Sequence, residues 1–372
     1  MTPPPRQPAD ILLDLVAIPS VSFTANNRLI DYATGLLGSR DWDLRLIGEE
    51  DQLNLVGVTR GHDSTVAELA LVCHTDTVPY DSDWAEAVHP VVREGRLYGR
   101  GSCDVKGYLA CVLAAVGRVD LSRLTKPLGV VLTANEEAGC LGAKRLAREE
   151  AFRAKAILIG EPTNLTPITA GKGYGLAEIV VRGREAHSAF PDRGRSAIRD
   201  AARVIERLDH VAQQLCSRTH PAFDPPFTTL NIGLIAGGSA KNIVPGQCRL
   251  TVEWRPIPGQ SCSWASDLIR DELDRLALDP GFQAELQVQR LDQPFESSGG
   301  RLISLLKSLS GEASRAVSFG TEAAHLAPLA DEVIVFGPGD MAVAHKTGEF
   351  VPVGELDSCV DILVRLIEQL CR

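Results

Sequence analysis

The stretch Leu71-Val-Cys-His-Thr-Asp-Thr-Val-Pro79 joins a strongly apolar run to two polar side chains, His74 and Asp76. The run starts just upstream and is nearly continuous over residues 68–73. A run of this kind is typical of a strand that is buried on both faces of a sheet. The sequence therefore predicts a buried strand that ends by presenting a histidine and an aspartate.

Predicted strands and helices alternate along the chain around this run. The apolar patterns predict strands over residues 43–47, 53–58, 68–73, 129–134, 156–160 and 332–336. They predict helices over residues 9–19, 26–37, 108–119, 141–150, 301–309 and 356–370. This alternation indicates an α/β fold with helices on both faces of the sheet.

The pattern changes in the middle of the chain. It predicts a strand, a helix, two strands, a helix and a strand over residues 176–182, 195–215, 228–235, 249–255, 263–276 and 282–288. The order β-α-β-β-α-β matches a ferredoxin-like module. Because the α/β pattern returns near Gly299, the module is predicted to be an insertion. We expect a catalytic domain over residues 1–172 and 296–372, with an inserted domain over 173–295.

Composition excludes several classes of protein. The formal net charge of −10 over 372 residues argues against a general nucleic-acid binder. No apolar stretch approaches the roughly 20 residues that span a bilayer, and the first residues lack a secretory signal pattern. The nine cysteines are odd in number, irregularly spaced and without a Cys-x-x-Cys pair, which argues against a disulfide framework and against a thiolate zinc site. We expect a cytoplasmic protein without membrane or nucleic-acid partners.

Further polar side chains follow the predicted strands. Glu136 and Glu137 come after residues 129–134, and Glu161 comes after 156–160. Asp104 follows a glycine-rich turn, and His345 follows Pro338. A lone histidine or acidic pair is usually an ordinary polar residue or a solvated turn. Five such signals at the strand ends, where α/β sheets form their binding crevices, favour a shared metal site.

The charges of these residues suit two divalent cations. Asp104, Glu137 and Glu161 carry three negative charges, and two neutral imidazoles, of His74 and His345, add none. One positive charge remains, which a deprotonated water molecule would neutralise. Imidazole and carboxylate ligands suit zinc, and cobalt could replace it.

Two acidic residues near the ligands remain to be explained. Glu136 is then free to take a proton from water and pass it to a leaving nitrogen. We expect the carboxylate of Asp76 to accept a hydrogen bond from the other ring nitrogen of His74.

These motifs resemble the M20 metallopeptidase family, which includes the aminoacylase and carboxypeptidase G groups. The likeness rests on His74-Thr-Asp76, Gly101-Ser-Cys-Asp104-Val-Lys-Gly107, Thr133-Ala-Asn-Glu-Glu137, Gly160-Glu-Pro-Thr163 and His345. The resemblance implies a zinc-peptidase-like catalytic domain with two zinc ions. His74 and Glu161 would bind one ion, Glu137 and His345 the other, and Asp104 would bridge them. Glu136 would be the general base and acid.

The inserted module resembles the family's dimerisation or lid domain. His187, in Ala186-His-Ser188, matches a histidine that reaches the partner subunit's active site and stabilises the tetrahedral oxyanion. Asn242 and Arg255 match positions that hold the substrate carboxylate, a role that suits a guanidinium. The resemblance therefore implies a homodimer formed through the inserted domain.

Within the family, the likeness is to the branch that hydrolyses N2-acetyl-L-ornithine to ornithine and acetate in arginine biosynthesis. It rests on residues 126–127, 160–163, 255–259, 320–323 and 336–339. Gly320, Thr321 and Glu322 are therefore candidate substrate-binding residues. Glu322 would either pair with a cationic substrate side chain or be a solvated loop acid.

Other activities are also consistent with the sequence. Lys346 adds a positive charge that suits neutral N-acetylcitrulline better than the acetylornithine ammonium group. N-succinyl-diaminopimelate is a further candidate substrate. A non-catalytic binding protein is the distant alternative, and such a protein would be expected to lose Glu136 or a ligand.

Overall fold

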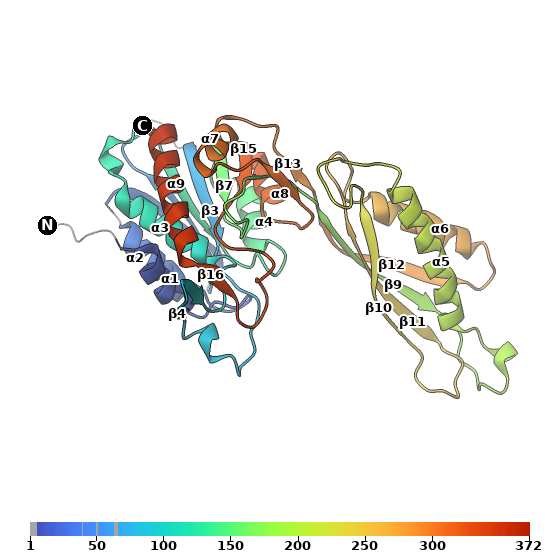
Figure 1. The fold of residues 1–372 in the computed structure, drawn as a ribbon. Helices are drawn as coiled ribbons and strands as arrows, with labels where there is room; N and C mark the ends of the chain where they lie inside the picture. Colours follow the sequence, from blue (N-terminus) through green and yellow to red (C-terminus); the bar gives the residue numbers. More distant parts are fainter. Residues whose placement is uncertain (1–5, 39, 50, 63–65) are drawn as a thin grey trace. The chain divides into compact units, whose positions relative to one another are not determined.

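The computed structural model describes residues 6–38, 40–49, 51–62 and 66–372 and divides into two compact units (Figure 1). The first unit contains Met1–Thr169, Ser297–Arg315 and Thr321–Arg372, and the second contains Ala170–Glu296 and Ala316–Gly320. The predicted division did not set residues 316–320 apart. They group with the second unit, where the backbone N–H of Lys172 donates to the carbonyl of Val317 (3.2 Å). That the units are separate domains stays a proposal.

The first unit is built on a mixed sheet whose central strands are parallel. Its order is β1-β2-β6-β3-β7-β15, and β6, β3, β7 and β15 run parallel. The strands are β1 (Trp42–Glu49), β2 (Gln52–Thr59), β3 (Ala67–His74), β6 (Leu128–Thr133), β7 (Ala154–Ile159) and β15 (Ala330–Val335). Every residue of β6 is buried, as is nearly all of β3. The prediction of strands buried on both faces is therefore confirmed.

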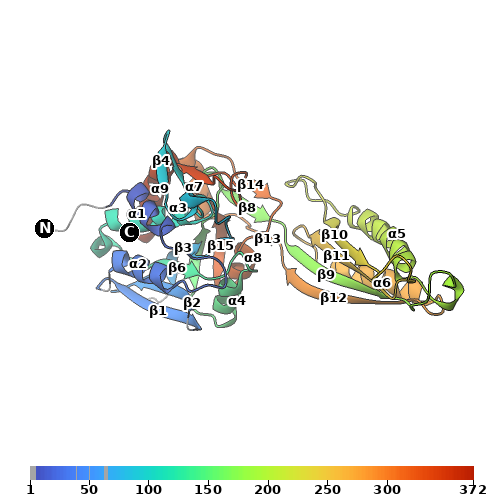
Figure 2. The ribbon, with the colours of Figure 1, turned by 90° about the horizontal axis from the view of Figure 1, so that it is seen from below.

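Helices cover both faces of this sheet (Figure 2). One group contains α1 (Pro8–Val16), α2 (Asn27–Leu37), α3 (Lys106–Arg118), α7 (Arg301–Ser310) and α9 (Val353–Cys371). The other contains α4 (Leu141–Arg148) and α8 (Ala323–Leu326), which contact each other. The predicted α/β class is confirmed. No helix among the described residues is both long and apolar enough to cross a membrane.

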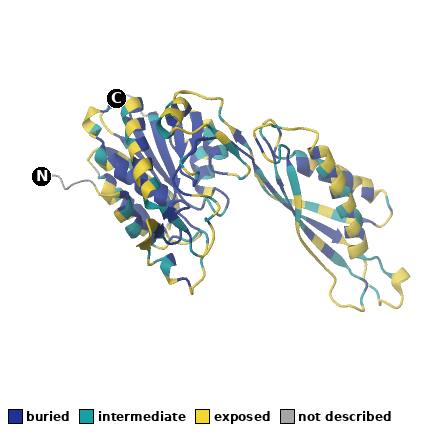
Figure 3. Ribbon diagram, in the orientation of Figure 1, coloured by how far each residue is buried: buried dark blue, intermediate teal, exposed yellow. Residues whose placement is uncertain are grey.

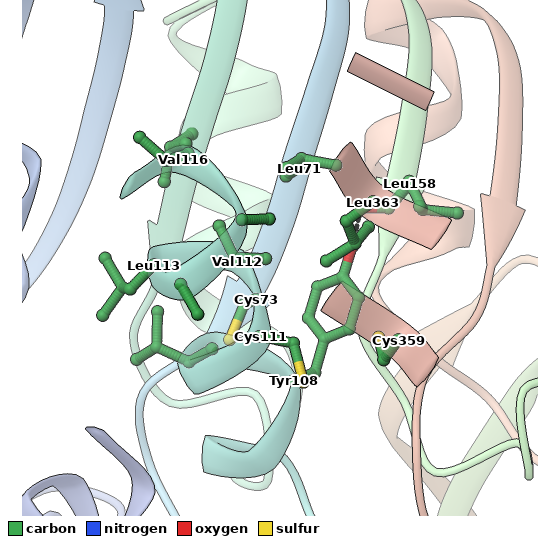
Figure 4. Packing of buried hydrophobic residues seen from close by; sticks show 14 of the residues in the cluster. Leu71, Cys73, Tyr108, Cys111, Val112, Leu113, Val116, Leu158, Cys359 and Leu363 are labelled. Atoms are coloured by element: carbon green, nitrogen blue, oxygen red, sulfur yellow. Dashed lines mark hydrogen bonds between the residues drawn. The ribbon is translucent and has the colours of Figure 1, made fainter. Parts of the chain in front are cut away.

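The core of the first unit lies where α3 and α9 meet the sheet (Figure 4). Tyr108 of α3 is fully buried, and its hydroxyl donates to the carbonyl of Leu158 on β7 (3.3 Å). Gly160 lies against this ring, and a Cβ placed there would be 2.0 Å from the Cδ1 atom of Tyr108. Only glycine fits at this position, so the ring and the end of β7 pack closely.

The second unit is a four-stranded antiparallel sheet with the order β10-β11-β9-β12. Its elements are β9 (Tyr174–Arg182), α5 (Ala197–Leu215), β10 (Thr229–Gly237), β11 (Gln247–Arg255), α6 (Trp264–Ala277) and β12 (Gln283–Asp292). Ser196 caps α5 by accepting from the backbone N–H of Arg199 (3.4 Å). Burial alternates along β9 and β12, so one sheet face packs on the helices (Figure 3). The predicted ferredoxin-like module is confirmed.

Several short elements escaped sequence analysis. A three-stranded sheet has the order β16-β5-β4, with β4 (Val91–Arg93), β5 (Arg96–Tyr98) and β16 (Phe350–Pro352). Strand β8 (Ile168–Gly171) pairs with β13 (Phe295–Glu296), β14 (Arg315–Val317) and β15. Short 3₁₀ turns occupy Ala85–Ala87, Leu121–Arg123, Pro191–Arg193 and Ala327–Leu329. Strands of two to four residues are too short to show a period.

Replacing Leu363 by alanine tests the importance of this core. Leu363 of α9 is fully buried in the cluster of Figure 4. We expect Leu363→Ala to lower the free energy of unfolding by about 2–5 kcal/mol, because it leaves a cavity. Urea denaturation measures this loss. Leu36→Ala, on the exposed side of α2, is the control and should change it by no more than about 0.5 kcal/mol.

Candidate metal centre and active site

The candidate ligands gather at one edge of the first unit's sheet. His74 is the last residue of β3, Glu137 follows the end of β6, and Glu161 follows the end of β7. Because these strands are parallel, their carboxyl ends meet at the same edge. Asp104 stands just before α3, and His345 lies in the segment between β15 and β16 with a left-handed φ of 59°.

Asp104 lies between two imidazoles and uses a different oxygen for each. Its Oδ1 is 3.2 Å from Nε2 of His74, and its Oδ2 is 3.1 Å from Nε2 of His345. Nε2 of His345 is also 2.8 Å from Oε1 of Glu137. Ligand atoms of His74, Asp104 and Glu137 all lie within 4.8 Å of one another. Asp104 therefore directs one carboxylate oxygen toward each imidazole.

The site concentrates buried negative charge. Burial and the neighbouring charge of Asp104 hold the pKa of Glu161 well above its usual range. Burial would lower the pKa of His74, but its hydrogen bond to Asp104 and the nearby carboxylates hold that pKa well above its usual value. The bonds of His345 to Asp104 and Glu137 raise its pKa to about 10. The site therefore favours positive charge at the imidazoles.

These residues fit a pair of divalent cations. The donor set is imidazole nitrogen and carboxylate oxygen, which suits zinc and related metals. Without a metal, the positive charge among the carboxylates comes from protons on the imidazoles. Two metal ions would supply that charge directly and leave both histidines neutral, as ligands must be.

Asp76 organises the turn that carries Glu136 and Glu137. Its Oδ1 accepts from the backbone N–H of Glu136 (2.9 Å), and its Oδ2 accepts from that of Glu137 (3.2 Å) and from the hydroxyl of Ser22 (2.6 Å). Nδ1 of His74 donates to the backbone carbonyl of Asp76 at 2.9 Å, whereas the carboxylate is 3.7 Å away. Asp76 therefore orients His74 through a different atom from the one predicted, because the turn amides occupy its carboxylate.

Glu136 is half-buried beside the ligands. Its Oε1 accepts a hydrogen bond from the thiol of Cys140 at 3.3 Å. Burial raises the pKa of Glu136 to about 8, against the lowering effect of His74. Sequence reasoning did not find the contacts of Cys140 and Ser22. Only the four-residue spacing of Cys140 from Glu136 could have hinted at one of them.

The cysteines beside the ligands are buried thiols. Cys73 donates to the carbonyl of His74 (3.3 Å), and Cys103 donates to that of Asp340 (3.4 Å). Burial raises the pKa of both thiols above its ordinary value, so both stay protonated. Neither thiol belongs to the ligand group that the described residues form.

Glu322 is fully buried, with 0% of its surface exposed. Neither of its carboxylate oxygens has a hydrogen-bond partner of normal geometry among the described residues. Of the two interpretations of this residue, the solvated loop acid is therefore wrong. Its neighbour Thr321 is also buried, and the hydroxyl of Thr321 accepts from the backbone N–H of Ala323 (3.2 Å). The pairing of Glu322 with a substrate cation stays a prediction.

The other candidate residues belong to the second unit, together with Gly320. His187 pairs with Ile243 in an isolated β-bridge, and the backbone N–H of Ser188 donates to the carbonyl of Asn242 (3.0 Å). Nδ1 of the exposed His187 ring accepts from the backbone N–H of Ala189 (3.1 Å), which leaves Nε2 as the ring nitrogen that can donate. The guanidinium of Arg255 lies 4.3 Å from the ring centre of Tyr174.

Known proteins resemble this chain along nearly its whole length. The pattern of Peptidase family M20/M25/M40 matches residues 70–369. A protein of Myxococcus xanthus named acetylornithine deacetylase is 46% identical over 97% of this chain and 96% of its own length. One of the same name from Proteus mirabilis is 33% identical over the same shares. The chain belongs to this peptidase family. It is an amidohydrolase.

Solved structures share the fold of this family member. Aminopeptidase PepT of Bacillus cereus superposes with a TM-score of 0.81 at 20% identity, covering 98% of both chains. The metallo-carboxypeptidase Sso-CP2 of Sulfolobus solfataricus has a TM-score of 0.78 at 17% identity and covers 98% of this chain and 99% of its own. YXEP of Bacillus subtilis, described as a dinuclear metal-binding peptidase, has a TM-score of 0.72 at 13% identity, covering 97% and 98%.

The burial of Glu322 predicts a pH-dependent effect on stability. Burial raises its pKa from 4.5 to about 7, so this group makes the folded state less stable as pH rises from 4.5 to 7. Glu322→Gln removes the charge. In metal-free protein we expect it to raise the free energy of unfolding at pH 8 by at most about 3 kcal/mol, with most of the gain lost at pH 5.

Urea denaturation at pH 5 and pH 8 measures this difference. Glu312→Gln, at an exposed position of the same unit, is the control and should show no such dependence. A stability difference between Glu322→Gln and wild type that is equal at the two pH values would contradict the prediction.

Proposed function

We propose that the enzyme hydrolyses the amide bond of N2-acetyl-L-ornithine to give L-ornithine and acetate, with two zinc ions per subunit. The carboxylate of Asp104, shared between two imidazoles, carries the proposal of metal-dependent hydrolysis. The choice of substrate is supported by the two relatives named acetylornithine deacetylase. A cytoplasmic location and a role in arginine biosynthesis stay predictions.

Five residues would hold the metal ions. His74 and Glu161 would hold one ion and Glu137 and His345 the other, with Asp104 between them. When bound, the ions supply a Lewis acid for the acyl oxygen and lower the pKa of water. The description of YXEP as dinuclear supports a pair of ions. Cobalt, which accepts the same ligand types, would substitute for zinc.

Glu136 would carry the proton. Its side chain is next to the ligands and is not needed as one, so in its ionised form it would take a proton from the attacking water and deliver it to the leaving nitrogen. Its backbone N–H is fixed by Asp76, and its Oε1 is oriented by the thiol of Cys140. These contacts leave Oε2 for the water.

The second unit would supply part of the substrate recognition. Nε2 of His187 would donate to the oxyanion of the tetrahedral intermediate. Asn242 and Arg255 would hold the substrate carboxylate. In the family that this chain resembles, the histidine acts in the partner subunit, which requires a homodimer. The exposed Leu234 and Ile235 on strand β10, 69% and 56% accessible, support an interface along that strand.

One observation favours a second candidate substrate. The ammonium group of Lys346 donates to the carbonyl of Ala342 at 2.6 Å, which fixes a positive charge in the segment that carries His345. That charge repels the ammonium group of ornithine but not the neutral side chain of citrulline. N-acetylcitrulline is therefore the second candidate. No described contact favours N-succinyl-diaminopimelate.

Steady-state kinetics with the three substrates test the proposal. We expect kcat/KM for N2-acetyl-L-ornithine to exceed those for N-acetyl-L-citrulline and N-succinyl-diaminopimelate by at least about tenfold, or ~1.4 kcal/mol of transition-state binding. Lys346→Gln should raise kcat/KM for acetylornithine more than for acetylcitrulline. A wild-type preference for acetylcitrulline would replace the proposed substrate with the second candidate.

Replacing Glu136 tests its role in proton transfer. We expect Glu136→Gln to lower kcat by about 10²–10⁴-fold, because the amide cannot accept the proton of water. Metal analysis should still find two ions per subunit, since Glu136 is not a ligand. Glu149→Gln, an exposed glutamate at the end of α4, should retain full activity. Near wild-type turnover by Glu136→Gln would show that another group carries the proton.

A further inference from the structure

Glu349 is a buried carboxylate that the proposed reaction does not use. Its side chain has no exposed surface, yet it accepts four hydrogen bonds. Oε1 accepts from the backbone N–H groups of Cys103 (2.9 Å) and Asp104 (3.0 Å). Oε2 accepts from the backbone N–H of Gly101 (3.1 Å) and from the guanidinium of Arg100 (2.6 Å). Both oxygens are therefore fully used by one short segment.

That segment is the turn that ends at Asp104. Gly101 has a left-handed φ of 79°, and its carbonyl accepts from the backbone N–H of Lys106 at 2.8 Å. The side chain of Asp104 is 5% exposed. Its backbone N–H would lie in this buried turn without an acceptor if Glu349 were absent. A buried N–H that loses its acceptor costs about 1–3 kcal/mol, so this carboxylate determines the shape of the turn.

Glu349 also connects this turn to the segment of His345. It stands four residues after His345 and directly before β16, which pairs with β5 through Phe350 and Tyr98. Its backbone carbonyl accepts from the N–H of Gly99 at 3.1 Å. One residue thus binds the turn of Asp104 with both its backbone and its side chain.

The charge of Glu349 is balanced inside the protein. Its partner Arg100 is 5% exposed, and the guanidinium lies 5.2 Å from the ring centre of Trp84. The ion pair is held in place by packing and by the amide hydrogen bonds. Both oxygens of Glu349 are satisfied, and a buried carboxylate held in this way is costly to alter.

We propose that Glu349 is a positioning residue that holds the carboxylate of Asp104 between His74 and His345. It touches neither the substrate nor the reacting atoms and acts through the turn of residues 99–104. This inference rests on the proposed role of Asp104 as the bridging ligand. It makes metal affinity depend on a side chain that binds no metal, as outer partners of metal ligands do.

The variant Glu349→Gln tests the inference. Glutamine keeps the shape but has one acceptor oxygen, and its amide nitrogen would face two donors whichever way it is turned. We expect the affinity for Zn²⁺, measured by competition with a chelator, to fall by about 10–100-fold. In metal-free protein, hydrogen exchange of residues 99–105 should become faster. With Co²⁺ bound, the visible absorption spectrum should shift.

Glu332 offers a matched control. It is also buried, and its carboxylate accepts from the backbone N–H groups of Leu302 (2.9 Å) and Ile303 (2.8 Å) at the start of α7. Glu332→Gln should destabilise the fold and speed exchange near residue 302, but leave Zn²⁺ affinity within about twofold of wild type. If Glu349→Gln behaves in the same way, with wild-type affinity for Zn²⁺ and an unchanged Co²⁺ spectrum, the inference is wrong.

A second variant, Glu349→Asp, tests the inference if Glu349→Gln folds poorly. Glu349→Asp keeps the charge and withdraws the carboxylate by one methylene, so we expect a weaker form of the same effects. If neither variant folds, Glu349 serves the whole fold rather than Asp104, and the inference fails. If the proposed function were wrong, the measurements would give a different result. Wild-type protein would then bind no stoichiometric Zn²⁺ or hydrolyse no acylated amino acid, while the exchange of residues 99–105 would still respond to Glu349→Gln.

Discussion

Buried negative charge at one edge of the parallel strands is the constraint on which this structure depends. Burying a carboxylate is costly unless it is paired and hydrogen-bonded. Asp104 meets that requirement with two imidazoles, and burial leaves Glu161 with a strongly raised pKa. The fold concentrates acids where the carboxyl ends of β3, β6 and β7 meet. Two metal ions would stabilise this arrangement by neutralising it.

The ligand turns are organised by carboxylates that are not themselves proposed ligands. Asp76 accepts from the backbone N–H groups of Glu136 and Glu137, and Glu349 accepts from those of Cys103 and Asp104. In both cases an acid accepts hydrogen bonds from backbone N–H groups of a turn that carries a proposed ligand. Backbone N–H groups compensate the charge of the acid, and the acid fixes the backbone. The same contacts thus satisfy the buried acids and would position the proposed ligands.

Sequence patterns predicted the helices and strands whose apolar pattern extends over many residues. The strands before His74 and Glu137 are long and apolar, so their positions and the polar residues at their ends could be predicted. The contact between Glu349 and Asp104 joins residues 245 positions apart, and no local pattern predicts it. The burial of Glu322 was equally hidden, because the helix that follows it, α8, is too short to show a period. The contact of His74 with the carbonyl of Asp76 could not be predicted either, because it depends on other donors occupying the Asp76 carboxylate.

The proposed site residues are divided between the two units. All proposed metal ligands and Glu136 belong to the first unit, whereas His187, Asn242 and Arg255 belong to the second. Solved structures that are 13–20% identical share this fold, although their names describe different peptidases. The strand edge that gathers the acids is fixed by the packing of buried strands. The surfaces of loops and of the second unit can change without disturbing that packing, so one metal chemistry can serve many amide substrates.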